Sequence, residues 1–149
     1  MTATILLAWV LLGCGAAPAP APVASATPGT VTTARGLYRL TWAPVPAPLP
    51  MGELFEVRTT VVDAASGAPL EVGSVMVDAR MPEHGHGMAT RPVADPGRCE
   101  DPAKPETCRH DGGFHVMRGM KFHMPGKWTI TFDVVGPAGK DHAEVGFTL

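Results

Sequence analysis

Apolar and polar residues alternate along several short segments of the chain. The clearest is residues 127–134, in which Trp128 begins a set of four apolar side chains at every second position. Because successive side chains of a β-strand point to opposite faces, this period of two predicts a strand with one buried face. Segments of similar character, separated by stretches rich in Gly, Pro, Asp and Ser, lie at residues 37–42, 54–62, 74–80, 114–117 and 143–149.

The expected strands predict the fold class. No segment of the sequence shows a sustained helical period bounded by capping residues. Six or seven short strands joined by Gly- and Pro-rich turns are typical of an all-β fold. We expect an antiparallel, immunoglobulin-like β-sandwich over residues 36–149. These 114 residues (149 minus 35) have the usual length of one domain.

A short apolar run at residues 5–13 is followed at once by Cys14. The run is too short to span a bilayer and is typical of the core of an export signal. The tetrapeptide Leu-Leu-Gly-Cys that ends at Cys14 resembles the lipobox of bacterial lipoproteins, although residues 1–4 carry no Lys or Arg. The resemblance implies a signal peptide at residues 1–13 and acyl chains on Cys14 that anchor the protein in a lipid membrane. The alternative is a buried N-terminal strand with an incidental cysteine.

Residues 14–35, which begin with this cysteine, consist mostly of Ala, Pro, Ser and Thr, with no charged side chain before Arg35. Such a segment buries too little apolar surface to offset the entropy of ordering it. Alternating Ala and Pro favour an extended polyproline II conformation that would reach roughly 65 Å, at ~3.1 Å per residue. We therefore expect a tether, in a membrane-anchored lipoprotein of the cell envelope that faces the periplasm or the exterior.

Cys99 and Cys108 are the two cysteines that remain. An even pair in an exported protein predicts a disulfide, which here would close a short polar loop. A metal-binding or redox-active thiol pair is the alternative. The spacing of Cys99 and Cys108 is wider than the Cys-x-x-Cys of such sites, which favours the structural disulfide.

Two segments combine imidazole and thioether side chains. One reads Met-Pro-Glu-His-Gly-His-Gly-Met at residues 81–88, and the other reads Met-Lys-Phe-His-Met-Pro-Gly at residues 120–126. Neutral imidazole and thioether groups suit copper, and Cu(I) in particular, better than they suit hard cations. Glycines in the first segment give its backbone the freedom to turn neighbouring side chains toward one point. The candidate metal ligands are His84, His86, Met88, His123 and Met124.

The order of these motifs carries a family resemblance. The segment Ala-Arg-Met-Pro-Glu-His-Gly-His-Gly-Met is followed, about 40 residues later, by Gly-Met-Lys-Phe-His-Met-Pro-Gly-Lys-Trp. This pattern is similar to the YtkA-like domain family of exported bacterial proteins, roughly over residues 36–149 and most specifically over residues 79–134. The resemblance implies an immunoglobulin-like sandwich outside the cytoplasm, and a copper association is suggested for related domains. The loop between Cys99 and Cys108 departs from the family core.

The two motifs can form one site only if the chain brings them to the same end of the sandwich. If residues 74–81 run toward one end, the 24 residues of 89–112 are long enough to return to the other end, at ~3.3 Å each. The strand that begins at Phe114 would then carry the second motif to the first. If instead residues 118–119 form a tight hairpin, the second motif lies at the opposite end. The family resemblance favours the first arrangement.

Several other side chains that resemble metal ligands have ordinary expected roles. The residues expected in the core are Met120 and Phe122, and Met51 and Met76 are also expected to be packed. The histidines expected at the surface or in solvent are His110, His115 and His142.

Composition and motifs exclude several classes of function. The formal net charge is −2 with acidic and basic residues interspersed, which is unlike a nucleic-acid binder. No catalytic triad order, carboxylate-pair motif or phosphate-binding loop stands out, so we expect a binding protein and not an enzyme. Glu83 could act as a base beside zinc, but thioethers disfavour zinc.

We expect a lipoprotein that handles or delivers copper. The alternative is a non-metal structural or interaction module with an unknown protein partner in the envelope.

Overall fold

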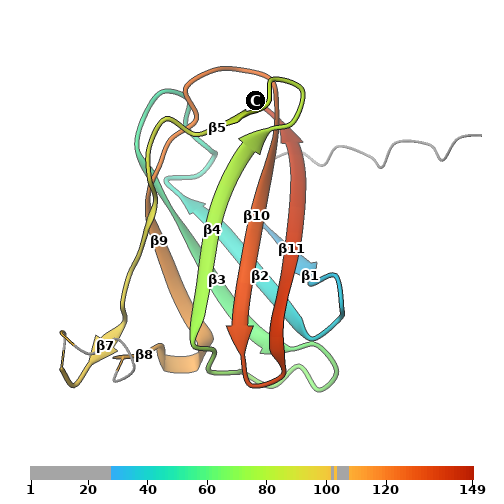
Figure 1. The fold of residues 1–149 in the computed structure, drawn as a ribbon, viewed down its shortest axis with the longest axis vertical. Helices are drawn as coiled ribbons and strands as arrows, with labels where there is room; N and C mark the ends of the chain where they lie inside the picture. Colours follow the sequence, from blue (N-terminus) through green and yellow to red (C-terminus); the bar gives the residue numbers. More distant parts are fainter. Residues whose placement is uncertain (1–27, 102, 104–107) are drawn as a thin grey trace, which may run out of the picture.

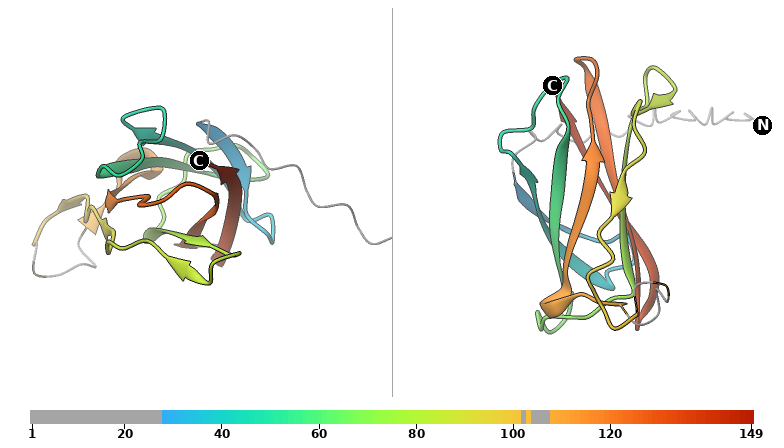
Figure 2. Two further views of the ribbon diagram at one scale, coloured as in Figure 1. Left: turned by 90° about the horizontal axis from the view of Figure 1, so that it is seen from above. Right: turned by 90° about the vertical axis from the view of Figure 1, so that its left-hand side faces the viewer.

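The computed structural model describes residues 28–101, 103 and 108–149, and it confirms the expected antiparallel β-sandwich (Figure 1). One sheet has the strand order β1-β2-β3-β9-β6, and the other has the order β11-β10-β4-β5. Neighbouring strands within both sheets pair antiparallel. The two sheets face each other across a shared interior (Figure 2).

The strands of the first sheet are β1 (Gly29–Thr32), β2 (Tyr38–Val45), β3 (Phe55–Asp63), β9 (Phe114–Met120) and β6 (Val93–Ala94). Those of the second sheet are β11 (Gly139–Thr148), β10 (Lys127–Gly136), β4 (Ser74–Met81) and β5 (His86–Gly87). A separate pair, β7 (Arg98–Cys99) and β8 (Cys108–Arg109), projects from the sandwich, and a 3-10 turn, η2 (Asp111–Gly113), leads into β9 (Figure 1). The six segments predicted as strands coincide with β2, β3, β4, β9, β10 and β11.

The core lies between the sheets and consists of alternate residues of the long strands. In β10 the four apolar residues at every second position, from Trp128 to Val134, are all buried, as the period of two predicted. Phe132 of β10 meets Trp42 of β2 across the interior, with ring centroids 5.7 Å apart. Burying one large apolar side chain contributes roughly 1.5–3 kcal/mol, so this shared interior is the main source of stability.

The expected start of the domain at residue 36 is wrong, because β1 already belongs to the first sheet. Val31 lies opposite Leu40 in the antiparallel register of β1 and β2. A four-residue edge strand that is only partly buried has too few positions to produce a clear period of two. The predicted signal peptide (residues 1–13), Cys14 and most of the predicted tether lie outside the described residues.

The prediction of which residues of β9 face the core is also wrong at the start of the strand. Phe114 is 46% exposed, whereas His115, which we expected at the surface, is only 5% exposed and lies within the sandwich. Met117 and Met120 are both buried although they are three positions apart, because the register between β3 and β9 shifts at a β-bulge. Gly119, the residue skipped by the pairing, has a φ of +80°, a conformation that favours glycine. The bulge returns Met120 to the core, as predicted.

Two residues expected to be packed, Met51 and Met76, are 43% and 47% exposed instead. On β4 the buried residues Val75 and Val77 flank Met76, so the alternation of the strand directs Met76 outward. Met51 follows β2 and forms an isolated bridge with Phe122, which is fully buried as predicted.

The expectation for the surface histidines holds for one of the three. His142 on β11 is exposed, as predicted. His110 is only partly exposed, and its ring stacks on that of His115 with centroids 3.9 Å apart. The inward phase of β9 creates this contact, which the sequence pattern did not indicate.

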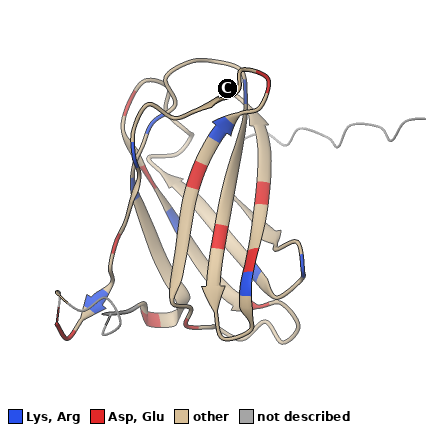
Figure 3. Ribbon diagram, viewed as in Figure 1, with Lys and Arg blue, Asp and Glu red and all other residues tan. Residues whose placement is uncertain are grey.

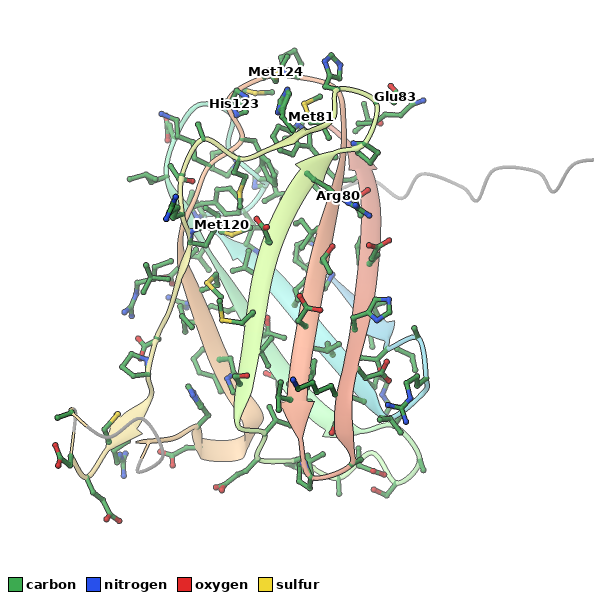
Figure 4. All side chains as sticks on the ribbon, viewed as in Figure 1. Arg80, Met81, Glu83, Met120, His123 and Met124 are labelled. Atoms are coloured by element: carbon green, nitrogen blue, oxygen red, sulfur yellow. The ribbon has the colours of Figure 1, made fainter. Side chains whose placement is uncertain are left out.

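Both histidine-bearing motifs reach the same end of the sandwich, so the first of the two arrangements is confirmed. β4 leads into the first motif, and β9 leads into the second at the same end (Figure 1, Figure 4). Residues 118–119 do not form a hairpin, because β9 continues through them to Met120. Across the described part of the chain, no helix is long and apolar enough to span a membrane.

Candidate metal centre

The first ligand loop, residues 82–88, is a tight turn that folds back onto β4. The backbone N–H groups of His84 and Gly85 donate to the carbonyl of Met81 over 3.2 and 3.0 Å. Gly85 has a φ of +67°, which residues with a side chain rarely adopt. The chain then returns as β5, where His86 pairs with Met81. The turn leaves the side chains of His84 and His86 exposed.

The second ligand loop, residues 121–126, joins β9 to β10 and is anchored on both sides of His123. On one side, Phe122 is fully buried, and its carbonyl accepts a hydrogen bond from the N–H of Gly52 over 2.8 Å. On the other side, Gly126 and Leu149 exchange two backbone hydrogen bonds of 3.0 Å. His123 itself is exposed between these anchors.

The two ligand loops bring three imidazole rings together. The ring centroids of His86 and His123 lie 5.3 Å apart, and those of His84 and His86 lie 5.8 Å apart. His86 and His123 are separated by 37 positions in the sequence (123 minus 86). The predicted convergence of the two motifs is therefore confirmed, whereas metal binding by these residues stays a prediction.

One hydrogen bond sets the tautomer of His86. Its Nδ1 lies 3.1 Å from the carbonyl oxygen of Gly87. Because a carbonyl only accepts hydrogen bonds, Nδ1 carries the proton in this contact, and Nε2 of the neutral ring holds the lone pair. A ring nitrogen that donates to a backbone carbonyl, which leaves the other nitrogen as an acceptor, is the usual arrangement of a metal-binding histidine.

The thioether groups of the two motifs are less exposed than the imidazoles. Met88 and Met124 are partly buried and pack against the core. Met81 is 1% exposed and fills the space beneath the loops (Figure 4). A Cβ at Gly126 would lie 2.6 Å from Cε of Met81, so the end of the Met81 side chain packs directly against this glycine, whose φ of +133° also disfavours a side chain. Met88 and Met124 are thus the available thioethers, and Met81 is a core residue.

An ion pair joins the first ligand loop to the start of β10. Nζ of Lys127 lies 2.8 Å from a carboxylate oxygen of Glu83. Their hydrogen bond and mutual attraction lower the pKa of the Glu83 carboxyl and raise the pKa of the Lys127 ammonium. Because both side chains are exposed, the pair contributes little to stability. Figure 3 shows acidic and basic positions interspersed along β4, β10 and β11.

Trp128 is the residue at this end that the sequence pattern assigned only to the core. Its ring centroid lies 6.4 Å from that of His86 and 5.7 Å from that of His123, in edge-on contacts. Its indole Nε1–H donates to the carbonyl of Met124 over 3.1 Å. Trp128 follows the second motif after one residue and ends the longer segment that carries the family resemblance, and this position is the signal that could have identified it.

The three imidazole rings lie side by side without forming a closed cage. Among the residues that the structure describes, no group of three or more His, Cys, Asp or Glu side chains is arranged to hold a metal ion. A shared ion would require rotation of the exposed imidazoles and a contribution from the thioethers.

The two remaining candidate residues, Cys99 and Cys108, lie between the two motifs in the sequence, but their strands project from the opposite end of the sandwich (Figure 1). They face each other in the antiparallel register of β7 and β8. Directly opposed residues of antiparallel strands have Cα atoms roughly 4.5–5.5 Å apart, which is within the range that a disulfide spans. The bond between them stays a prediction.

Comparisons with known proteins found distant structural similarity. No family model matches the sequence, and no curated protein matches it. Among solved structures, the chain is similar to FetP of uropathogenic Escherichia coli. A copper-bound variant of FetP has a TM-score of 0.46 and 8% identity, over 84% of this chain and 91% of that chain. FetP as isolated has a TM-score of 0.44 and 11% identity, over 82% and 93%. These values are too low to carry an argument about function.

Proposed function

We propose that the end of the sandwich formed by the two ligand loops binds copper, with Cu(I) favoured, in a protein that handles or delivers this metal. The observation that carries the proposal is the approach of His86 and His123 to 5.3 Å from two separate loops. Two exposed imidazoles from different loops gain little from packing at this position, so a shared ligand explains their convergence best.

The spacing of the rings suits a shared ion. A metal–imidazole bond of about 2 Å places each ring centroid about 3 Å from the metal, so two bound rings lie roughly 5 Å apart. The separations of 5.3 Å for His86 and His123 and of 5.8 Å for His84 and His86 are close to this value. The tautomer of His86 adds support, because its Nε2 already holds the lone pair that a metal needs.

The donor set favours copper over zinc. Imidazole and thioether are soft or intermediate neutral donors, which suit Cu(I). The carboxylate of the first ligand loop, Glu83, is paired with Lys127 and would have to leave that partner to serve zinc. We assign His86, Met88 and His123 as the principal ligands, with His84 and Met124 as candidates to complete the set. Copper is the cargo of such a site, and the exposure of the imidazoles would let a partner reach it.

The proposed setting is the cell envelope. The apolar run before Cys14 and the Ala- and Pro-rich tether support a lipidated Cys14 that anchors the domain in a membrane. The paired motifs support membership of the YtkA-like domain family. An envelope protein that supplies or receives the metal is the expected partner, and the role is that of a binding protein and not of an enzyme.

Competition with a chromogenic Cu(I) chelator, under reducing and anaerobic conditions, tests the proposal on the protein purified in detergent. We expect one copper per chain and a loss of affinity of at least about tenfold for His86→Ala and for His123→Ala. The matched control is His142→Ala, because His142 is an exposed histidine on β11. Wild-type binding no tighter than that of an unstructured peptide with the same His and Met content would reject the proposal.

A second candidate function is a non-metal interaction module. Leu54 and Val93 are 64% and 67% exposed, and both lie near Arg118 on the first sheet. Large exposed apolar side chains are candidates for a surface that meets a partner when they belong to one patch. This second function would be favoured by two results together. The wild-type protein would bind no copper, and Leu54→Asp would lose the binding of a protein partner.

A further inference from the structure

We propose that Trp128 is a positioning residue that holds the two ligand loops in one fixed arrangement, so that the imidazoles of His86 and His123 face a common point. This inference rests on the proposed copper function for its purpose, but the arrangement of the loops can be tested without copper. One buried side chain, Trp128, would then hold together two loops that are distant in the sequence.

The first observation is that the indole of Trp128 contacts a histidine from each loop. Its ring centroid lies 6.4 Å from that of His86 and 5.7 Å from that of His123, and both contacts are edge-on. Edge-to-face contacts between aromatic rings at such distances contribute beyond the area that they bury. A movement of either imidazole away from the indole therefore loses a contact with Trp128.

The second observation is the hydrogen bond from the indole Nε1–H to the carbonyl of Met124, over 3.1 Å. Met124 follows His123 directly, so the bond fixes the backbone at the ligand itself. Trp128 is 1% exposed and packs against Phe122 with ring centroids 4.8 Å apart. Because the indole is held by the core, it is a rigid support for exposed ligands.

Trp42 provides a matched control for the role of Trp128. It is also buried, at 2% exposure, and it packs against Phe132 in the interior. In the described residues it has no ring contact with His86 or His123. Trp42→Phe therefore reproduces the loss of a buried indole without a change at the ligand loops.

The test compares Trp128→Phe with Trp42→Phe in the metal-free protein, by NMR of the histidine ring protons. We expect the resonances of His86 and His123 to move in Trp128→Phe, because the ring current and the hydrogen bond change, while those of His142 stay in place. In Trp42→Phe the resonances of His86 and His123 should stay in place. Unmoved His86 and His123 resonances in Trp128→Phe would overturn the inference, whether or not the protein binds copper.

A copper titration then tests whether the position of the two imidazoles affects the affinity for Cu(I). We expect Trp128→Phe to weaken Cu(I) binding by about tenfold, the effect of losing roughly one net hydrogen bond, and Trp42→Phe to change it less than about twofold. Equal affinity of Trp128→Phe and wild type would also overturn the inference. If wild type binds no copper while the ring resonances respond as expected, the proposed function fails and the contact of Trp128 with both ligand loops stands.

A measurement on the wild-type protein covers the case in which Trp128→Phe does not fold. The indole N–H of Trp128 should exchange slowly with solvent, and its ring protons should show cross-relaxation with the ring protons of both His86 and His123. Fast exchange of this N–H together with no cross-relaxation to either histidine would contradict the proposed arrangement.

Discussion

The imidazole of His115 stacks on that of His110, with ring centroids 3.9 Å apart and an angle of 29° between the ring planes. His115 lies near the start of β9 and pairs with Thr59 of β3. Both Nε2 of His115 and Oγ1 of Thr59 are buried without a hydrogen-bond partner among the described residues. Burial, and secondarily the nearby His110, lower the pKa of His115 from 6.5 to about 4.

This shift predicts a pH-dependent stability. The folded protein resists protonation of His115, whereas the unfolded chain takes up the proton below a pH of about 6.5. The free energy of unfolding should therefore be highest above pH 6.5 and fall by roughly 1–3 kcal/mol between pH 6.5 and pH 4. Denaturant titrations across this range measure the change.

The control for the pH effect is the exposed His142. In His115→Leu the fall in stability between pH 6.5 and pH 4 should become smaller, whereas in His142→Leu it should remain. An unchanged pH profile in His115→Leu would show that other groups cause the fall.

Neighbouring glycines of η2 offer a test of backbone packing. Gly112 and Gly113 both have positive φ values, of +64° and +73°. A Cβ at Gly113 would lie 2.5 Å from the carbonyl oxygen of Val61 and 2.6 Å from that of Leu70, whereas a Cβ at Gly112 would meet nothing within 4 Å. Gly113→Ala should therefore destabilise the protein by roughly 2 kcal/mol more than Gly112→Ala. Equal thermal unfolding of the two variants would contradict the close approach of these backbones.

The facing positions of Cys99 and Cys108 predict a disulfide in the exported protein. Mass spectrometry of a non-reduced digest should find both cysteines in one linked species that separates on reduction. Replacing both with Ser should lower the free energy of unfolding by at most about 2–3 kcal/mol, because the closed loop is short. Two unlinked thiols in freshly isolated protein would disprove the bond.

The apolar run before Cys14 predicts a lipid anchor. In Cys14→Ser the protein should leave the membrane fraction or remain unprocessed, because the acceptor of the acyl chains is missing. Cell fractionation and the mass of the mature protein measure both outcomes. A Cys99→Ser variant, which keeps Cys14, should fractionate like the wild type. Membrane association of Cys14→Ser with unchanged mass would rule out the anchor.

The pattern of apolar residues was sufficient to predict the long strands, and it failed at β1 and in the phase of β9. In β10, every second residue is buried, so local alternation and tertiary burial agree. In β9, Phe114 is more apolar than His115, yet His115 is the buried residue. The bulge at Gly119 then changes the phase again, and a glycine in a strand does not by itself reveal a bulge.

By itself, the sequence determined the all-β class, the main strands and the chemistry of the two ligand loops, because strand period and donor type are local properties. Only the tertiary structure decided that His86 and His123 meet, since the long connection between β4 and β9 allowed either end of the sandwich. It also decided that Trp128 supports both loops while it belongs to the core. Proximity between distant loops depends on how the sheets pair and pack, and these non-local interactions leave no periodic pattern in the sequence.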